Sequence, residues 1–232
     1  TGKPISNRGS EGREEATSMG GLYVFNALKE SLNLEGPLNI VVQGLGNVGG
    51  NAALLFEADG HKIIALSDSR GAILNLDGLD VKAVMEYKKE TGSVVGFPNS
   101  KEISQNELLT LPCHVLIPSA LENQITIENV KDVNARLVLE LANGPTTPEA
   151  DDILFAKGIH VVPDILANSG GVTVSTFEWE QNLKNEKWTK EEVFEKLKVK
   201  MEKEALNVLD YSRANNTDLR RGAFIIAMER LS

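Results

Sequence analysis

Short apolar runs alternate along this chain with segments of helical periodicity. Five runs predict buried strands, at residues 38–43, 62–67, 114–118, 136–140 and 159–162. Between them, apolar positions at helical spacing predict helices at residues 51–58, 81–90 and 148–156. Strands and helices that alternate in this way favour an α/β fold with a doubly wound, mostly parallel sheet and helices on both faces. Residues 71–80 and 92–105 are rich in turn formers and predict connections, the second with room for a short strand.

Helical regions also flank the alternating core. Ser10 is a candidate N-cap for a helix that runs to about Leu32, and Gly20 and Gly21 in it indicate close approach of another element or of a cofactor. From Thr189 onward an apolar stripe recurs every four residues, and residues 221–231 repeat the pattern. We therefore divide the chain into an N-terminal loop and helix (1–35), a central sheet domain (36–188) and C-terminal helices that pack on it (189–232).

The first predicted strand runs directly into Gly44-Leu-Gly-Asn-Val-Gly49, a G-x-G-x-x-G pattern at a strand-to-helix turn. In this setting Gly44 permits the tight turn, Gly46 lets the backbone approach a pyrophosphate, and Gly49 lets the helix pack closely on the strand. The N-terminus of the helix offers unpaired N–H groups to anionic oxygens. The pattern predicts a Rossmann-like dinucleotide site.

Asp68 strengthens this prediction, because it ends the next strand 19 positions after Gly49. An acid about 20 residues beyond the glycines is expected to bind the ribose hydroxyls. Two alternatives remain. The glycines can serve packing only, with Asp68 as a surface turn residue, and S-adenosylmethionine enzymes share much of the pattern.

Composition excludes several classes of function. A net charge of −9 and a pI near 5.0 argue against a nucleic-acid surface and against a generic membrane-surface role. The single cysteine, Cys113, excludes an internal disulfide and a cysteine-built zinc site, and is expected to be a core residue. We see no signal peptide and no apolar stretch of membrane-spanning length, and no metal site is predicted. We therefore expect a soluble protein of the cytoplasm.

Two polar clusters follow later predicted strands. They are Asn143-Gly-Pro-Thr-Thr-Pro148 and the segment 163–175, which contains Asn168. The carboxyl ends of parallel strands share one edge, so both clusters should meet the glycine turn there. Their amides can donate and accept, as a nicotinamide carboxamide or a substrate carbonyl requires. Ordinary loop structure is the alternative, because Asn and Gly are common in turns.

Several of these segments together resemble glutamate dehydrogenase, of the Glu/Leu/Phe/Val dehydrogenase family. The segments that carry the resemblance are residues 9–17, 44–49, 67–69, 142–147, 162–175, Phe177-Glu-Trp-Glu-Gln-Asn182 and Ala227-Met-Glu-Arg230. Leucine, phenylalanine and valine dehydrogenases are related, but the Pro-Thr-Thr and Phe-Glu-Trp segments look like the glutamate branch. The resemblance covers essentially the whole chain.

The resemblance implies a role for each matching residue. The cofactor-binding residues it implies are Gly44, Gly46, Asn47, Val48 and Gly49 at the pyrophosphate, Asp68 and Ser69 at the adenine-side ribose, Ala142 and Asn143 at the nicotinamide ribose, and Thr17 and Asn168 at the carboxamide. Ser175 would reach the substrate, and Arg13 would support the hinge between two domains. Gly170 and Gly171 would keep the cleft floor open, and Leu141 could narrow the cleft unless it packs outward.

The resemblance also implies that only the cofactor half is present. The family's substrate domain, with its catalytic lysine and aspartate, has no counterpart here, so we expect Thr1 to lie at the hinge of a longer protein. That protein would oxidise L-glutamate to 2-oxoglutarate and ammonium with a nicotinamide dinucleotide, as a homo-oligomer. The present chain would bind the dinucleotide but contain no catalytic residue and show no activity. A noncatalytic NAD(H)-binding module is the second hypothesis, and a methyltransferase a distant third.

Two neighbouring side chains bear on the choice of cofactor. Asp68 would repel a 2′-phosphate and favours NAD, whereas Arg70 could pair with one and favours NADP. We expect NAD, with NADP as the alternative.

Overall fold

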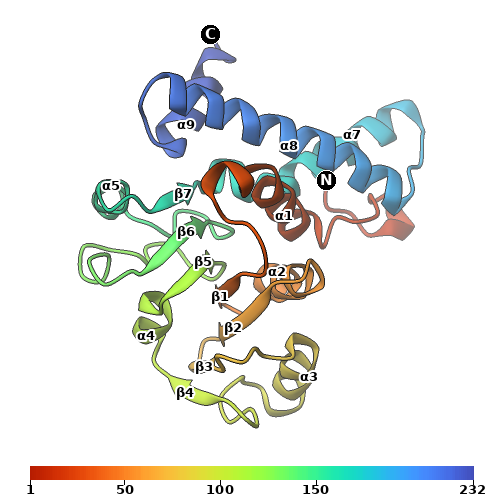
Figure 1. Cartoon of the computed structure of the whole chain (residues 1–232). Helices are drawn as coiled ribbons and strands as arrows, with labels where there is room; N and C mark the ends of the chain where they lie inside the picture. The colour runs from red at the N-terminus through yellow and green to blue at the C-terminus, as the bar shows by residue number, and fades with distance from the viewer.

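A seven-stranded sheet with helices on both faces forms the centre of the computed structural model, which describes residues 1–232 (Figure 1). The strands are β1 (Asn39–Gln43), β2 (Lys62–Ser67), β3 (Ala72–Leu74), β4 (Lys101–Ile103), β5 (Cys113–Pro118), β6 (Ala135–Leu139) and β7 (His160–Val162). Their order is β4-β3-β2-β1-β5-β6-β7. The five neighbouring strands β2, β1, β5, β6 and β7 are parallel, whereas β3 and β4 are antiparallel and extend the sheet beyond β2. The predicted doubly wound, mostly parallel sheet is confirmed.

Neighbouring residues of a strand point to opposite faces of the sheet, and here both faces are apolar, so helices cover both. They are α1 (Ala16–Leu28), α2 (Asn47–Ala58), α3 (Val81–Thr91), α4 (Gln105–Thr110), α5 (Pro148–Ala156), α6 (Asp164–Ala167), α7 (Gly170–Lys184), α8 (Lys190–Ala214) and α9 (Leu219–Glu229), with short 3-10 turns at Ile5–Asn7 and Glu30–Leu32. In β1, Ile40 and Val42 face the larger core with α1, α2 and α8, whereas Val41 faces a smaller core with α4 and α5. Burial on both faces explains why the strands are continuous apolar runs.

Several local features differ from those predicted. The prediction of Ser10 as an N-cap is wrong, because α1 begins at Ala16 and the Ser10 hydroxyl instead accepts a hydrogen bond from Gln181 Nε2 at 3.1 Å. Helix α2 begins at Asn47, four residues earlier than predicted. Strand β3 lies in a segment predicted as a connection, and α7 occupies part of the polar cluster at 163–175, whereas β4 lies where a short strand was expected.

The glycine pair in α1 allows close helix packing. A Cβ atom on Gly20 would lie 2.8 Å from the Cα of Gly170, and one on Gly170 would lie 2.1 Å from the carbonyl oxygen of Ala16. The predicted close approach is confirmed, and α7 is the approaching element. Gly170 therefore serves helix packing and not an open cleft floor. Leu141 is 3% exposed and lies against Gly21, so it packs into the core.

Helix α8 lies across α1 and packs with it and with the sheet in one core (Figure 1). Residues before the sheet and after it thus contribute to the same hydrophobic interior. The three-part division of the chain stays a prediction. No helix combines the length and the apolarity that crossing a membrane requires. Burial raises the pKa of Cys113 to about 12, which fits a core thiol rather than a nucleophile.

Candidate cofactor site

The glycine turn lies where the sheet changes its winding direction. Strand β1 is paired with β2 on one side and with β5 on the other. The chain builds the sheet from β1 outward through β2, β3 and β4, and then returns to the other side of β1 to add β5, β6 and β7. Open α/β sheets bind ligands at this point, outside the carboxyl ends of the strands.

Each glycine of the turn has a distinct environment. Gly44 has φ of +91° and donates its N–H to Ser67 Oγ at 3.1 Å. A Cβ atom on Gly49 would lie 1.7 Å from the carbonyl oxygen of Gly44, so only glycine fits there. A Cβ atom on Gly46 would meet nothing within 4 Å. The backbone at Gly46 is therefore open to a ligand while the turn beneath it is closed by packing.

The N-terminus of α2 follows this open position. Gly46 is the N-cap residue, and no side chain caps the helix. The first N–H groups of the helix therefore have no partner within it. The Asn47 side chain is exposed and donates to the Glu14 carbonyl at 3.2 Å, and the Val48 carbonyl accepts from Ser18 Oγ at 2.8 Å. These bonds tie α1 to the turn and leave the N–H groups free.

Lys88 is a residue of this site that the sequence analysis missed. It lies in the last turn of α3, and its Nζ donates to the Leu45 carbonyl at 2.5 Å. An ammonium group thus lies beside the glycine turn. The sequence gives no signal of this, because nothing in it says that α3 returns to the turn.

Asp68 is held by the protein on both carboxylate oxygens. One oxygen accepts from the N–H groups of Arg70 at 2.8 Å and Gly71 at 3.3 Å and from Ser93 Oγ at 3.3 Å, and the other accepts from Val94 N–H at 2.7 Å. Asp68 is 7% exposed, whereas the neighbouring Ser69 and Arg70 are exposed. The carboxylate therefore organises two loops at the edge of the sheet. Its contact with a ribose stays a prediction.

Replacing Asp68 by asparagine should lower the free energy of unfolding by about 2 kcal/mol at pH 7, because the charge is lost and an amide nitrogen replaces one of the two accepting oxygens. Burial raises the pKa of Asp68, but its hydrogen bonds outweigh burial and hold the pKa below its ordinary value. The unfolded chain then binds a proton more readily than the folded one. The stabilisation is present above the unfolded-state pKa of about 4 and is lost as the pH falls through the lower folded-state pKa.

Urea unfolding of Asp68→Asn and of the unchanged protein between pH 7 and pH 3 measures this difference. Asp77→Asn is the matched control, because Asp77 is exposed and its carboxylate accepts no hydrogen bond. A difference in stability that stays constant down to pH 3 would contradict the expectation.

The two amides predicted at the carboxyl edge do lie together. Asn168 Nδ2 donates to Asn143 Oδ1 at 2.7 Å and to the Ala142 carbonyl at 3.3 Å. The Asn143 Nδ2 and Asn168 Oδ1 atoms have no protein partner, which leaves one donor and one acceptor for a ligand. Ala142 itself is held by its N–H, which donates to the Pro118 carbonyl at 2.9 Å. Ser119 and Ala120, which follow Pro118, lie beside Gly49 and Gly44 of the glycine turn, so the amides and the turn border the same segment.

The remaining predicted residues lie on α1 and α7. Thr17 contacts Gly171, where a Cβ atom would lie 2.6 Å from Thr17 Oγ1. Ser175 accepts a hydrogen bond from Arg13 Nε at 3.1 Å. Arg13 thus holds the predicted substrate-facing serine, and its role at a hinge stays a prediction.

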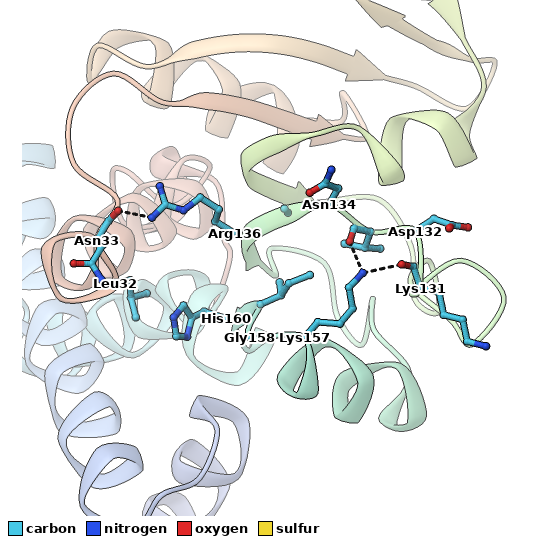
Figure 2. A pocket seen from close by; sticks show the side chains of 12 residues that line it. Leu32, Asn33, Lys131, Asp132, Asn134, Arg136, Lys157, Gly158 and His160 are labelled. Carbon is cyan, nitrogen blue, oxygen red and sulfur yellow. Dashed lines mark hydrogen bonds between the residues drawn. The ribbon is translucent and has the colours of Figure 1, made fainter.

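A different hollow, of about 550 Å³, lies at the amino ends of the strands, opposite the glycine turn (Figure 2). Two of its basic side chains serve the fold. Lys157 Nζ donates to the carbonyls of Val133 at 2.7 Å and Lys131 at 2.8 Å, and Arg136 Nη2 donates to the Asn33 carbonyl at 2.8 Å. Because this hollow borders the amino ends of β6 and β7, it is separate from the glycine turn.

Known proteins are similar to this chain over all of its residues. A glutamate dehydrogenase of Thermotoga maritima is 47% identical, and an NADP-specific glutamate dehydrogenase of Synechocystis is 44% identical. Each alignment covers 100% of this chain and 56% of the relative, so the chain spans about half the length of the curated relatives it matches.

Solved structures agree with this similarity. The hetero-hexameric glutamate dehydrogenase of Thermus thermophilus superimposes with a TM-score of 0.93 at 36% identity, over 100% of this chain and 55% of that one. The glutamate dehydrogenase of Peptoniphilus asaccharolyticus gives 0.85 at 37% identity, over 99% of this chain and 54% of that one. The model of the Glutamate/Leucine/Phenylalanine/Valine dehydrogenase family matches residues 9–232, and the chain therefore belongs to that family.

Proposed function

We propose that this chain is the dinucleotide-binding part of a glutamate dehydrogenase. The intact protein would convert L-glutamate to 2-oxoglutarate and ammonium with a nicotinamide dinucleotide. The observation that carries the proposal is the open backbone at Gly46, at the point where the sheet changes direction, with the Asn143 and Asn168 amides along the same edge. The glutamate dehydrogenases among the similar proteins support this branch of the family.

The residues present fit a dinucleotide. Gly46 leaves space for the pyrophosphate, and the N–H groups of Asn47, Val48 and Gly49 can donate to its oxygens. Lys88 adds a positive charge beside the turn. At the other end, the unpartnered atoms of Asn143 and Asn168 match the donor and acceptor of a carboxamide.

This chain's contribution to the reaction would be binding and orientation. The nicotinamide supplies the hydride acceptor. Asn143 and Asn168 would fix its orientation, with Thr17 nearby, while Ser175 on α7 would face the substrate. Proton transfer needs a basic group close to the substrate, and we assign no residue of this chain to that role. The whole protein would be a homo-oligomer of the cytoplasm.

The buried state of Asp68 bears on the choice between NAD and NADP. Its carboxylate keeps a negative charge at the ribose end of the site, which disfavours a 2′-phosphate, so we propose NAD as the preferred cofactor. Exposed Arg70 offers the positive charge for NADP, the alternative.

Calorimetric titration of the purified chain with NADH and with NADPH tests the proposal. We expect NADH to bind at least about tenfold more tightly, or about 1.4 kcal/mol. Tighter binding of NADPH would transfer the discriminating role to Arg70. Absence of binding by either ligand would refute the cofactor assignment. We also propose that this chain alone does not oxidise glutamate. Formation of NADH from NAD and glutamate, measured by absorbance, should therefore be undetectable, and its detection would refute this.

A further inference from the structure

A half-buried arginine near the amide pair has three acidic neighbours from different elements. Arg220 on α9 is 18% exposed, and its Nη2 donates to Glu140 Oε1 at 2.7 Å. Its Nε lies 3.1 Å from an oxygen of Asp151 on α5, and its Nη1 lies 3.5 Å from Asp164 Oδ1 at the start of α6. Glu140, directly after β6, is fully buried. One guanidinium therefore joins α5, α6, α9 and the end of β6.

The network continues from Arg220 to the residues that carry the amides. The second oxygen of Glu140 accepts from the Asp164 N–H at 2.9 Å. Asp164 Oδ2 in turn accepts from the Gly144 N–H at 2.8 Å, one residue beyond Asn143. The Asp164 carbonyl accepts from the Asn168 N–H at 3.0 Å, across the single turn of α6. Asp164 thus holds both the loop of Asn143 and Asn168, the residue that follows α6.

A buried ionic network is an expensive way to stabilise a fold, since apolar side chains of similar size often do as well. What such a network can supply is a fixed arrangement of the groups bonded to it. Here those groups are the backbones on either side of the Asn143–Asn168 hydrogen bond. Arg221, the next residue, provides a comparison, because its side chain is 52% exposed and pairs with Asp152 and Asp218 away from the amides.

We propose that Arg220 is a positioning residue for the nicotinamide end of the dinucleotide, acting through Glu140 and Asp164 on Asn143 and Asn168. The inference rests on the proposed dinucleotide site. It predicts that loss of Arg220 weakens binding of the nicotinamide end alone. The contacts proposed for the pyrophosphate at Gly44 to Gly49 and for the adenine-side ribose at Asp68 share no hydrogen bond with this network and should keep their strength.

Two ligands separate the ends of the site: NADH, and ADP-ribose, which lacks the nicotinamide. Titrating both into the unchanged chain and into Arg220→Met should show about a tenfold loss of NADH affinity, or 1.4 kcal/mol, with ADP-ribose affinity unchanged within about twofold. Arg220→Lys keeps a charge but not the fork geometry, so it should lose less NADH affinity and again spare ADP-ribose. Arg221→Met, the matched control, should change neither.

The outcomes distinguish this inference from the proposed function. Equal weakening of both ligands by the Arg220 variants would show a general structural role and overturn the inference. Unchanged NADH affinity would overturn it as well, and so would equal affinity of the unchanged chain for NADH and ADP-ribose, because the nicotinamide would then make no contact. If the unchanged chain bound neither ligand, the proposed function would fail first. If Arg220→Met did not fold, Arg220→Lys would decide by the same comparison.

Discussion

Replacing Gly49 by alanine should lower the free energy of unfolding by about 3 kcal/mol and weaken NADH binding at least about tenfold. The added methyl group would lie 1.7 Å from the Gly44 carbonyl oxygen, which is backbone and cannot rotate away. The turn must then open, and the N–H groups of α2 move from their positions at the end of β1. Denaturant unfolding and fluorescence titration with NADH measure the two effects.

Gly50→Ala is the matched control, one residue further in the same helix. A Cβ atom there would lie 3.2 Å from the tip of Met85, a flexible side chain that can shift, and at an ordinary 4.0 Å from Leu45. Alanine also favours a helix over glycine by about 1 kcal/mol. We expect this variant to be as stable as the unchanged chain or more so, and to bind NADH normally. Equal effects at both positions would refute the packing role assigned to Gly49.

Replacing Arg220 by methionine should lower the free energy of unfolding by about 3–5 kcal/mol at pH 7.5, because it leaves the buried Glu140 without its counter-ion. Burial raises the pKa of Glu140, and Arg220 opposes part of that rise. Without Arg220 the pKa rises further, so the folded variant holds a proton that the unfolded chain releases at neutral pH. Its stability should therefore fall as the pH rises from about 5 to 8.

Urea unfolding of the variant at pH 5 and at pH 7.5 tests this expectation. Arg221→Met should lose less than about 1 kcal/mol, because exposed ion pairs contribute little. A second replacement, Glu140→Met, should recover part of the loss in Arg220→Met by removing the unpaired charge. A loss that is the same at both pH values would show that packing, and not charge, is what Arg220 provides.

The parts of the fold that the sequence predicted are those with strong local signals. The parallel strands are continuous apolar runs, and α5 matches its predicted bounds because Thr147 caps it and Pro148 opens it. The antiparallel strands β3 and β4 have three residues each, too few for a pattern. Helix α7 escaped prediction because it begins with two glycines and buries polar residues such as Glu178 and Gln181.

The candidate site divides in the same way. Gly44, Gly46 and Gly49 have the environments that their spacing implied, since the motif is a local property of the backbone. The distant partners of Asp68, Ser93 and Val94, and the approach of Lys88 to Leu45 join segments that lie 25 to 43 residues apart, which no local pattern reveals. The same holds for Arg220, which reaches Glu140 from 80 residues along the chain.

The packing of α1 against α7 and α8 has a consequence for synthesis on the ribosome. The apolar face of α1 is made early, and Phe25 packs on Phe56 of α2, which follows soon after. The side of α1 that packs on α7 and α8 is covered only when these last long helices emerge. At about 5–20 residues per second, α1 waits on the order of ten seconds for them. During that time we expect the uncovered side of α1 to be open to chaperones. Nascent chains stalled before Gly170 should therefore remain bound to chaperone, and chains released after Ala214 should not.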